Sequence, residues 1–202
     1  MGQREHQAGS MTGEHSVNGK QRPDLSGETS GLGLVTVFTG NGKGKTSAAL
    51  GVVLRAAGHG LRVHIIYFMK GDFPYGERQA LSHLDNVDIS HFGHETFVDP
   101  ANVRPEEIAE ARRGLEKTRE VLRSGNYDVV VLDEINVAVA WKLLDLESVL
   151  ELLRNRPPDV ELLLTGRYAV TELMEAADLV TEMVNIKHPY DRGILSRKGI
   201  DY

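Results

Sequence analysis

The sequence predicts an α/β fold in which a mostly parallel sheet is covered on both faces by helices. Three observations lead to this prediction. From residue 34 onward, short apolar runs alternate with helical patterns, which is typical of parallel sheets. A glycine-rich loop joins the first apolar run to the first helical run. Two later apolar runs end in charged residues, as strands do when their carboxyl ends carry ligands.

The glycine-rich loop is Thr39-Gly40-Asn41-Gly42-Lys43-Gly44-Lys45-Thr46-Ser47. Its glycines let the backbone adopt positive φ and turn N–H groups inward, and the N-terminus of the next helix adds about half a positive charge. We therefore predict a phosphate-binding loop in which Lys45 reaches a phosphate and the Thr46 hydroxyl ligates Mg²⁺. Thr39 stands where the strict pattern has glycine, and Lys43 is a second lysine inside the loop. The alternative interpretation is a surface turn rich in glycine and lysine.

Four elements are expected between this loop and residue 104. A helix of about 13 residues begins at Lys45 and ends at Gly58-His59-Gly60, where glycine can adopt the left-handed conformation that closes helices. Next come a strand over 63–68, a short helix over 77–84 and a strand over 87–92. The loop 69–76 leaves the carboxyl end of the second strand, a place where open α/β sheets bind ligands. The stretch 93–104 has no periodicity.

The second half of the chain continues the alternation. Pro105 suits the first turn of a long helix that runs to about Ser124. A strand over 127–132, a helix over 146–155 and strands over 160–164 and 179–186 follow.

Composition separates the chain into a domain over 31–202 and an N-terminal tail over 1–30. The tail is polar and has almost nothing to bury, so we expect it to be disordered or to become ordered only against a partner. The chain has no cysteine, no run of about 18 apolar residues and no signal peptide, so we expect a cytoplasmic protein without a membrane span. A formal charge of −6 argues against nucleic acid as the main partner.

Two carboxylates follow the strand over 127–132. Asp133 and Glu134 are candidate Mg²⁺ ligands together with Thr46, because one carboxylate, a hydroxyl and phosphate oxygens can hold this ion. The alternative for Asp133 is that it caps the next turn.

Two arginines are candidate nucleotide contacts. Arg167 follows the strand over 160–164 and a glycine, and its planar guanidinium matches phosphate oxygens, although a surface ion pair is the alternative. Arg55 lies within the first helix, where it can equally pair with a neighbouring carboxylate.

The histidines form no convincing metal cluster, and His91 with His94 is a weak zinc pair. The polar segment 187–193, with His188, suits an anionic ligand or a partner subunit.

These segments together resemble the P-loop corrinoid adenosyltransferases, and the resemblance covers about residues 33–202. The matching segments are Thr-Gly-Asn-Gly-Lys-Gly-Lys-Thr at 39–46, Arg-Ala-Ala-Gly-His-Gly at 55–60, Tyr-Phe-Met-Lys-Gly at 67–71, Gly-Glu-Arg at 76–78, Val-Leu-Asp-Glu-Ile-Asn at 131–136, Thr-Gly-Arg at 165–167, Ala-Ala-Asp-Leu-Val-Thr-Glu-Met at 176–183, Lys-His-Pro-Tyr-Asp at 187–191 and Lys-Gly-Ile-Asp-Tyr at 198–202. A phosphate loop alone indicates only a nucleotide, whereas this ordered set is specific.

The resemblance implies a three-layer P-loop NTPase-like (RecA-like) fold and a transferase that moves the 5′-deoxyadenosyl group of ATP to Co(I) of a reduced corrinoid, with triphosphate as the leaving group. In this family the phosphates lie in the loop in an orientation reversed from that of ordinary P-loop NTPases. By this resemblance, Thr46 and Glu134 hold Mg²⁺, Lys43, Lys45 and the loop amides stabilise the triphosphate, and Arg167 and Arg55 contact the nucleotide. It also implies an electron-donating reductase as a partner and a homodimer.

The sequence departs from the family pattern at two places. Tyr168-Ala169-Val170 follows Thr-Gly-Arg, where the family has small residues. Some members use aromatic residues to displace the lower cobalt ligand, and here Phe92 and Phe97 lie in that region without a tryptophan. The alternative functions are an ATP-hydrolysing motor or kinase, and a binding module that passes on a corrinoid without chemistry.

Overall fold

Six parallel strands form one sheet in the part of the chain that the structure describes. The structure is a computed structural model that describes residues 31–202, so the tail expected for residues 1–30 lies outside it. The strand order is β3-β2-β4-β5-β1-β6, and every neighbouring pair is parallel. The strands are β1 (Val35–Thr39), β2 (Val63–Tyr67), β3 (Val87–His91), β4 (Val129–Asp133), β5 (Glu161–Thr165) and β6 (Leu179–Glu182). The parallel sheet that the sequence predicts is confirmed.

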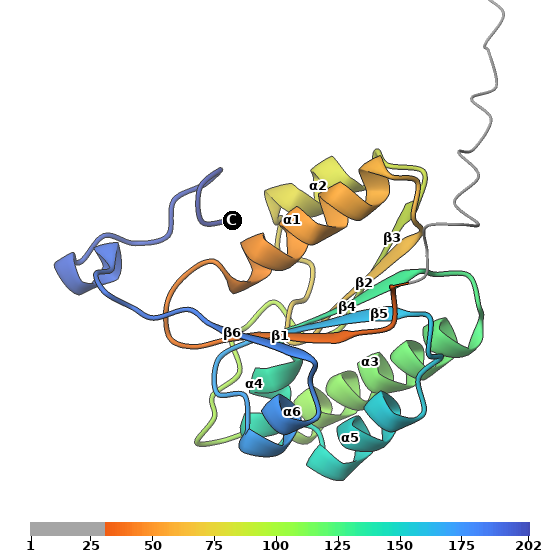
Figure 1. Ribbon diagram of the computed structural model, residues 1–202. Coiled ribbons are helices and arrows are strands. Elements are labelled where there is room, and N and C mark those ends of the chain that lie inside the picture. Colours follow the sequence, from red (N-terminus) through yellow and green to blue (C-terminus); the bar gives the residue numbers. More distant parts are fainter. Residues whose placement is uncertain (1–30) are drawn as a thin grey trace, which may run out of the picture.

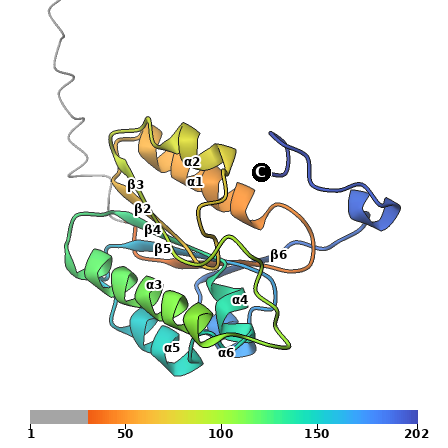
Figure 2. The same ribbon diagram turned by 180° about the vertical axis from the view of Figure 1, so that it is seen from behind.

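Helices cover both faces of this sheet and complete three layers (Figure 1, Figure 2). One face carries α1 (Lys45–Gly58) and α2 (Gly76–Leu81). The other face carries α3 (Pro105–Arg123), α4 (Ile135–Ala140), α5 (Leu146–Arg154) and α6 (Thr171–Glu175). A 3₁₀ turn (Pro189–Arg192) lies in the C-terminal segment, which leaves the sheet edge and returns toward α1 and α2 (Figure 1).

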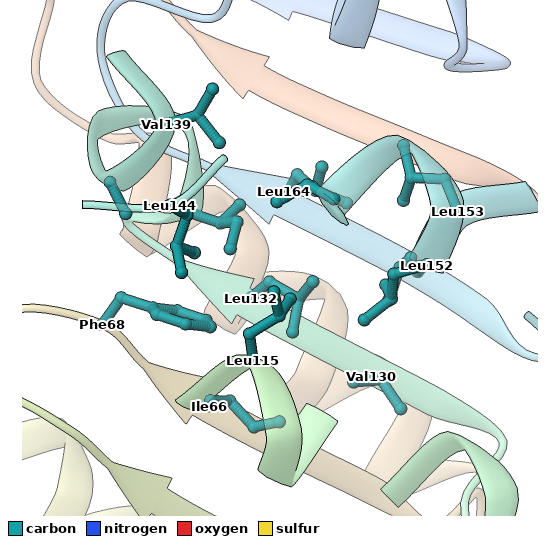
Figure 3. Packing of buried hydrophobic residues seen from close by; sticks show 14 of the residues in the cluster. Ile66, Phe68, Leu115, Val130, Leu132, Val139, Leu144, Leu152, Leu153 and Leu164 are labelled. Atoms are coloured by element: carbon teal, nitrogen blue, oxygen red, sulfur yellow. The ribbon is translucent and has the colours of Figure 1, made fainter. Parts of the chain in front are cut away.

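The core consists of two hydrophobic clusters, one on each face of the sheet. Alternate residues of a strand point to opposite faces. Ile66, Val130 and Leu164 therefore pack toward α3 and α5 together with Phe68 (Figure 3). Their neighbours along the strands, such as Ile65, pack toward α1. Burial on both faces explains why these strands are continuous apolar runs in the sequence.

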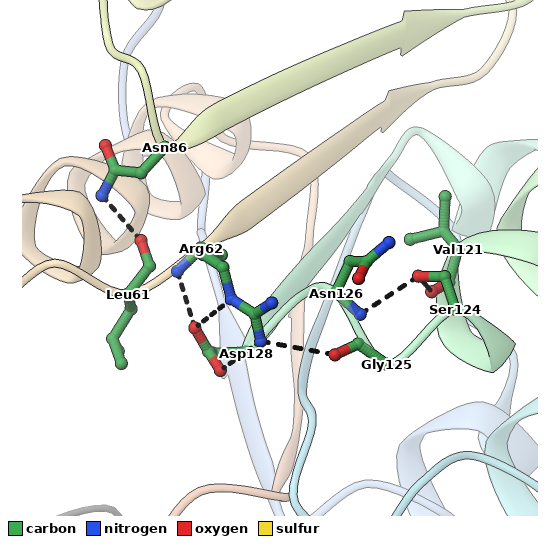
Figure 4. Close-up of polar contacts among 8 residues, drawn as sticks. All are labelled: Leu61, Arg62, Asn86, Val121, Ser124, Gly125, Asn126 and Asp128. Carbon is green, nitrogen blue, oxygen red and sulfur yellow. Dashed lines mark hydrogen bonds and ion pairs between the residues drawn. The ribbon is translucent and has the colours of Figure 1, made fainter.

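The amino ends of β2 and β4 are joined by polar contacts. The Arg62 backbone N–H donates to Asp128 Oδ2 over 2.7 Å, and the Asp128 N–H donates to the Arg62 carbonyl over 2.9 Å (Figure 4). Nearby, Asn86 Nδ2 donates to the Leu61 carbonyl (Figure 4). β4 begins at Val129, two residues later than predicted.

Three further differences separate the structure from the prediction. The short helices α4 and α6 were not expected, because six and five residues are too few for a helical period to stand out. In α4, buried apolar side chains stabilise the helix despite its three β-branched residues. The last strand ends at Glu182 and not at 186, because the chain then leaves the sheet edge and Met183 contacts the phosphate loop.

Candidate active site

The predicted phosphate loop connects β1 to α1 at the carboxyl edge of the sheet. Gly44 precedes the first helical residue with φ 117°, a conformation that favours glycine. Gly42 donates its N–H to the Met183 carbonyl over 2.6 Å, and a Cβ at Gly42 would lie only 2.8 Å from that oxygen. Glycine is therefore required where the loop packs against the chain after β6.

Lys45 lies across the inside of this loop. Its ammonium donates to the Gly40 carbonyl over 2.8 Å and to the Gly42 carbonyl over 2.7 Å, and the residue is only 8% exposed. Burial, followed by the positive charge of Arg167, lowers the pKa of Lys45. A phosphate at the loop would offer this cation the charge that the two neutral carbonyls do not.

A cavity of about 1050 Å³ opens beside the loop. It collects side chains from the loop, from the carboxyl ends of β2, β4 and β5, and from the C-terminal segment. Most of the predicted site residues line it, namely Gly42, Lys43, Gly44, Lys45, Thr46, Ser47, Glu134 and Arg167. Other lining residues include Met69, Lys70, Tyr75, Phe97, Trp141, Tyr168, His188 and Tyr202.

The two carboxylates at the end of β4 have different environments. Asp133 is 1% exposed, and its oxygens accept from Lys70 Nζ over 2.6 Å and from Thr165 Oγ1 over 2.7 Å. Glu134 lines the cavity, and its carboxylate makes no hydrogen bond or ion pair with the described residues. Burial, followed by the negative charge of Asp133, raises the pKa of Glu134. Among the described residues Glu134 is thus the carboxylate without a direct ion pair, although Lys70, Lys45 and Arg167 lie close enough to act on its pKa.

The residues present fit a Mg²⁺ ion that is shared with phosphate. Thr46 and Glu134 offer a hydroxyl and an unpaired carboxylate to the same cavity, and oxygen donors are the ligands Mg²⁺ prefers. Within residues 31–202, no three His, Cys, Asp or Glu side chains form a group that could hold a metal ion by themselves. His91 Nε2 lies 2.8 Å from Asp72 Oδ1.

The remaining predicted residues, Arg167, Arg55 and Thr39, differ from one another in their position relative to the cavity. Arg167 is exposed and lines the cavity, and its positive charge acts to lower the pKa of Lys45 and, against the larger effect of burial, that of Glu134. Arg55 lies on the exposed side of α1 and does not line the cavity, so its nucleotide contact stays a prediction. The Thr39 hydroxyl accepts from the Ala169 N–H over 3.2 Å.

Asn41 and Gly40 belong to the loop but are not among the residues that line the cavity. Where the sequence departs from the family pattern, Tyr168 adopts φ 62° and lines the cavity. Of the two aromatic residues noted in the sequence, Phe97 is 95% exposed and lines the cavity, whereas Phe92 packs against the core.

The C-terminal residues form a wall that periodicity did not predict. Asp201 pairs with Lys43 of the phosphate loop over 2.7 Å, and Tyr202 packs edge-on against Phe73 with ring centroids 5.1 Å apart. Hydrogen bonds from Arg197 and Lys43 hold the pKa of Asp201 well below its usual range. The only signal in the sequence was the Lys-Gly-Ile-Asp-Tyr ending.

Lys70 and Thr165 were likewise not assigned a role from the sequence. Two signals could have indicated them: both follow or end strands at the carboxyl edge, and both lie in segments that match the family pattern, 67–71 and 165–167.

Comparison with known proteins gives a consistent result. Residues 31–202 match the family described as ATP:corrinoid adenosyltransferase BtuR/CobO/CobP. A corrinoid adenosyltransferase of Escherichia coli K12 is 38% identical over 84% of this chain and 86% of its own length. Corrinoid adenosyltransferases of a Sinorhizobium species and of Salmonella typhimurium LT2 are 36% and 37% identical over 88% and 84% of this chain, and over 84% and 86% of their own lengths.

A search for membrane spans found none: no helix within residues 31–202 is both long enough and apolar enough to cross a bilayer.

Proposed function

The chain belongs to the ATP:corrinoid adenosyltransferase family, and from this premise we propose how its cavity transfers the 5′-deoxyadenosyl group of ATP to a reduced corrinoid. Co(I) of the corrinoid is the nucleophile. Its electron pair forms the bond to C5′, the C5′–O5′ bond breaks, and that electron pair leaves with the triphosphate. The protein needs no covalent catalyst and contributes positioning and electrostatics.

The observation that carries this proposal is the charge distribution around the loop. Lys43, Lys45 and Arg167 place three cations in the lining of one cavity. A triphosphate leaves more readily when its growing negative charge is met by fixed positive groups. Lys45 would exchange its two carbonyl acceptors for phosphate oxygens, and the loop N–H groups would add to the same field.

Thr46 and Glu134 would hold Mg²⁺ with the phosphate oxygens. When bound, this ion supplies further neutralisation of the leaving triphosphate. Glu134 suits this role because it faces the cavity without a positive partner among the described residues, whereas both Asp133 oxygens are engaged.

The cavity also has an aromatic lining that suits the corrinoid. Phe97, Trp141 and Tyr75 line it, and aromatic side chains bury large apolar ligands well. Phe97 is the aromatic residue that we propose to lie near the lower face of cobalt, since it reaches the cavity and Phe92 does not.

The family also leads us to propose a reductase that supplies the electron, a homodimer and a cytoplasmic location. Exposed apolar side chains on and after β6, including Leu179, Val184 and Ile186, support a subunit contact because exposed apolar patches commonly mark interfaces.

The test is an anaerobic assay with chemically reduced cobalamin, ATP and MgCl₂. The Co(I) absorbance should decay only when protein, ATP and Mg²⁺ are all present, and one triphosphate should appear per cobalt–carbon bond. Release of inorganic phosphate without loss of Co(I) would instead indicate the hydrolase, and nucleotide binding without either product would indicate the binding module.

A further inference from the structure

The residue that carries the proposed metal contact, Glu134, has an unfavourable backbone conformation. It adopts φ 66° and ψ 14°, in the left-handed region that non-glycine residues rarely occupy. Such a conformation costs free energy and persists only where the surroundings impose it. Contacts with neighbouring residues must therefore stabilise the Glu134 backbone in this conformation.

Thr165 touches Glu134 from the adjacent strand. The register of β4 and β5 pairs Leu132 with Leu164, so the next residues, Asp133 and Thr165, lie side by side. The Thr165 hydroxyl accepts the Glu134 N–H over 3.0 Å and donates to Asp133 Oδ1 over 2.7 Å. Thr165 is fully buried, so neither bond competes with water.

Lys70 completes the arrangement from the loop that follows β2. Its ammonium lies 2.6 Å from Asp133 Oδ2, and it is flanked by the rings of Tyr67 and Tyr75 at 5.3 and 5.1 Å. Each oxygen of Asp133 is therefore committed, one to a cation and one to a hydroxyl. The Asp133 carboxylate keeps the Thr165 hydroxyl oriented so that its lone pair meets the Glu134 N–H.

The opposite side of the same turn is also held by the end of β5. Asn136 Nδ2 donates to the Gly166 carbonyl over 3.1 Å and to the Phe38 carbonyl over 3.3 Å, and Asn136 is fully buried. A Cβ at Gly166 would lie 3.0 Å from the Asn136 Cβ, so strand and turn are in close contact.

We propose that Thr165, Asp133 and Lys70 are positioning residues that hold the Glu134 backbone so that its carboxylate faces the phosphate loop, and that Asp133 is not itself a metal ligand. This inference rests on the proposed role of Glu134 toward Mg²⁺. Residues that orient a metal ligand typically contribute about 10–100-fold to metal affinity or activity. Thr165 is the member to test, because valine has nearly its shape and lacks the hydroxyl.

The experiment measures ATP binding by calorimetry at a series of Mg²⁺ concentrations and in EDTA, for the wild type, Thr165→Val, Thr165→Ser and Glu134→Gln. We expect Thr165→Val to need about tenfold more Mg²⁺ for the same gain in ATP affinity and to bind ATP normally in EDTA. Thr165→Ser keeps the hydroxyl and should match the wild type. Thermal melting shows whether each variant folds, and Thr165→Ala, which lacks the same two bonds, replaces a valine variant that does not.

Three results would overturn the proposal. An unchanged Mg²⁺ dependence in Thr165→Val, with a clear loss in Glu134→Gln, would remove the positioning role and leave the proposed function intact. An equal loss of ATP binding with and without Mg²⁺ would make Thr165 a residue that shapes the loop as a whole. An unchanged Glu134→Gln would show instead that Glu134 does not hold the ion, so that the premise fails first.

Discussion

Lys45 combines a structural and a chemical role at the residue scale. Its ammonium donates hydrogen bonds to the Gly40 and Gly42 carbonyls and so stabilises the loop conformation. Hydrogen bonds to a charged group contribute about 1.5–3 kcal/mol each, so Lys45→Ala would weaken the loop and remove the cation together. Loss of activity in that variant would therefore not isolate the chemistry.

Thr46 gives a cleaner test of the phosphate loop. Its side chain lines the cavity, and no hydrogen bond joins its hydroxyl to the described residues. We predict that Thr46→Ala lowers the rate of Co(I) consumption at least about 100-fold, because a direct ligand should matter more than the groups that orient one. The free energy of unfolding should change by less than about 0.5 kcal/mol.

Thr46→Ser is the matched control, since it keeps the hydroxyl and loses only a methyl group. Urea unfolding and the anaerobic assay on the same preparations separate the two effects. Full activity in Thr46→Ala, or equal losses in both variants, would contradict a role for the hydroxyl.

The residue types in the loop were sufficient to predict a glycine-dependent loop between β1 and α1, and its Lys45 and Thr46 line the cavity. That these positions face a phosphate stays a prediction. The different contacts of the Asp133 and Glu134 carboxylates were not predictable from the sequence. They depend on Lys70 and Thr165, which lie far away in sequence and meet Asp133 only through the strand order.

At the scale of elements, the C-terminal segment has the clearest unexpected role. Asp201 lies 2.7 Å from Lys43, where it occupies a cation that we assign to the triphosphate. A carboxylate at this place competes with a phosphate for the same ammonium. We therefore expect the C-terminal segment to act against the retention of an anion in the loop.

We predict that Asp201→Asn binds inorganic triphosphate more tightly, by roughly two- to fivefold, as expected for losing one competing charge at a partly exposed pair. The difference should shrink as the salt concentration rises, because salt screens exposed charges. Calorimetric titration with triphosphate at low and high salt measures both effects.

Asp191→Asn is the control for this prediction. Asp191 lies in the same segment and contacts the His188 N–H instead of Lys43, so its loss changes the net charge equally. Equal tightening in both variants would mean that only the overall charge matters. Weaker triphosphate binding in Asp201→Asn would mean that the C-terminal segment stabilises the bound triphosphate.

Among the elements, the long ones were predictable and the short ones were not. α1 and α3 begin at the predicted residues and end within one residue of the prediction, because Gly58-His59-Gly60 and Pro105 are strong local signals. α4 and α6 have six and five residues, too few for a local helical pattern to stand out.

At the scale of the whole molecule, the alternation of strands and helices was enough to predict a parallel sheet with two covered faces. The strand order could not be predicted from the sequence, because β1 lies between β5 and β6, which come much later in the chain. The cavity depends on this strand order. Because only β5 separates β4 from β1, the loop after β1 and the turn after β4 lie close enough to line one cavity.

The stability of the whole molecule should depend on pH through one buried histidine far from the cavity. His64 in β2 is 5% exposed, its Nε2 lies 2.9 Å from Ser90 Oγ, and its ring meets Tyr127 edge-on. Asp88 and Lys117 are the charged groups that act on it, with opposite signs. Burial, the largest effect, lowers the pKa of His64 to about 4.

A lowered pKa means that the unfolded chain binds a proton at pH values where the folded protein does not. The free energy of unfolding should therefore fall as the pH drops from the ordinary histidine pKa of 6.5 toward 4. Below both pKa values His64 is protonated in the folded and the unfolded state, so it should cause no further loss. Between pH 6.5 and 5 the loss from His64 should be about 1.6 kcal/mol. Urea unfolding at several pH values measures it in the wild type and in His64→Gln, which stays neutral and can still bond to Ser90. Other groups titrate alike in both proteins, so the difference between the two curves isolates His64. Parallel curves from pH 6.5 to 5 would show that His64 is protonated as easily in the folded protein as in the unfolded chain.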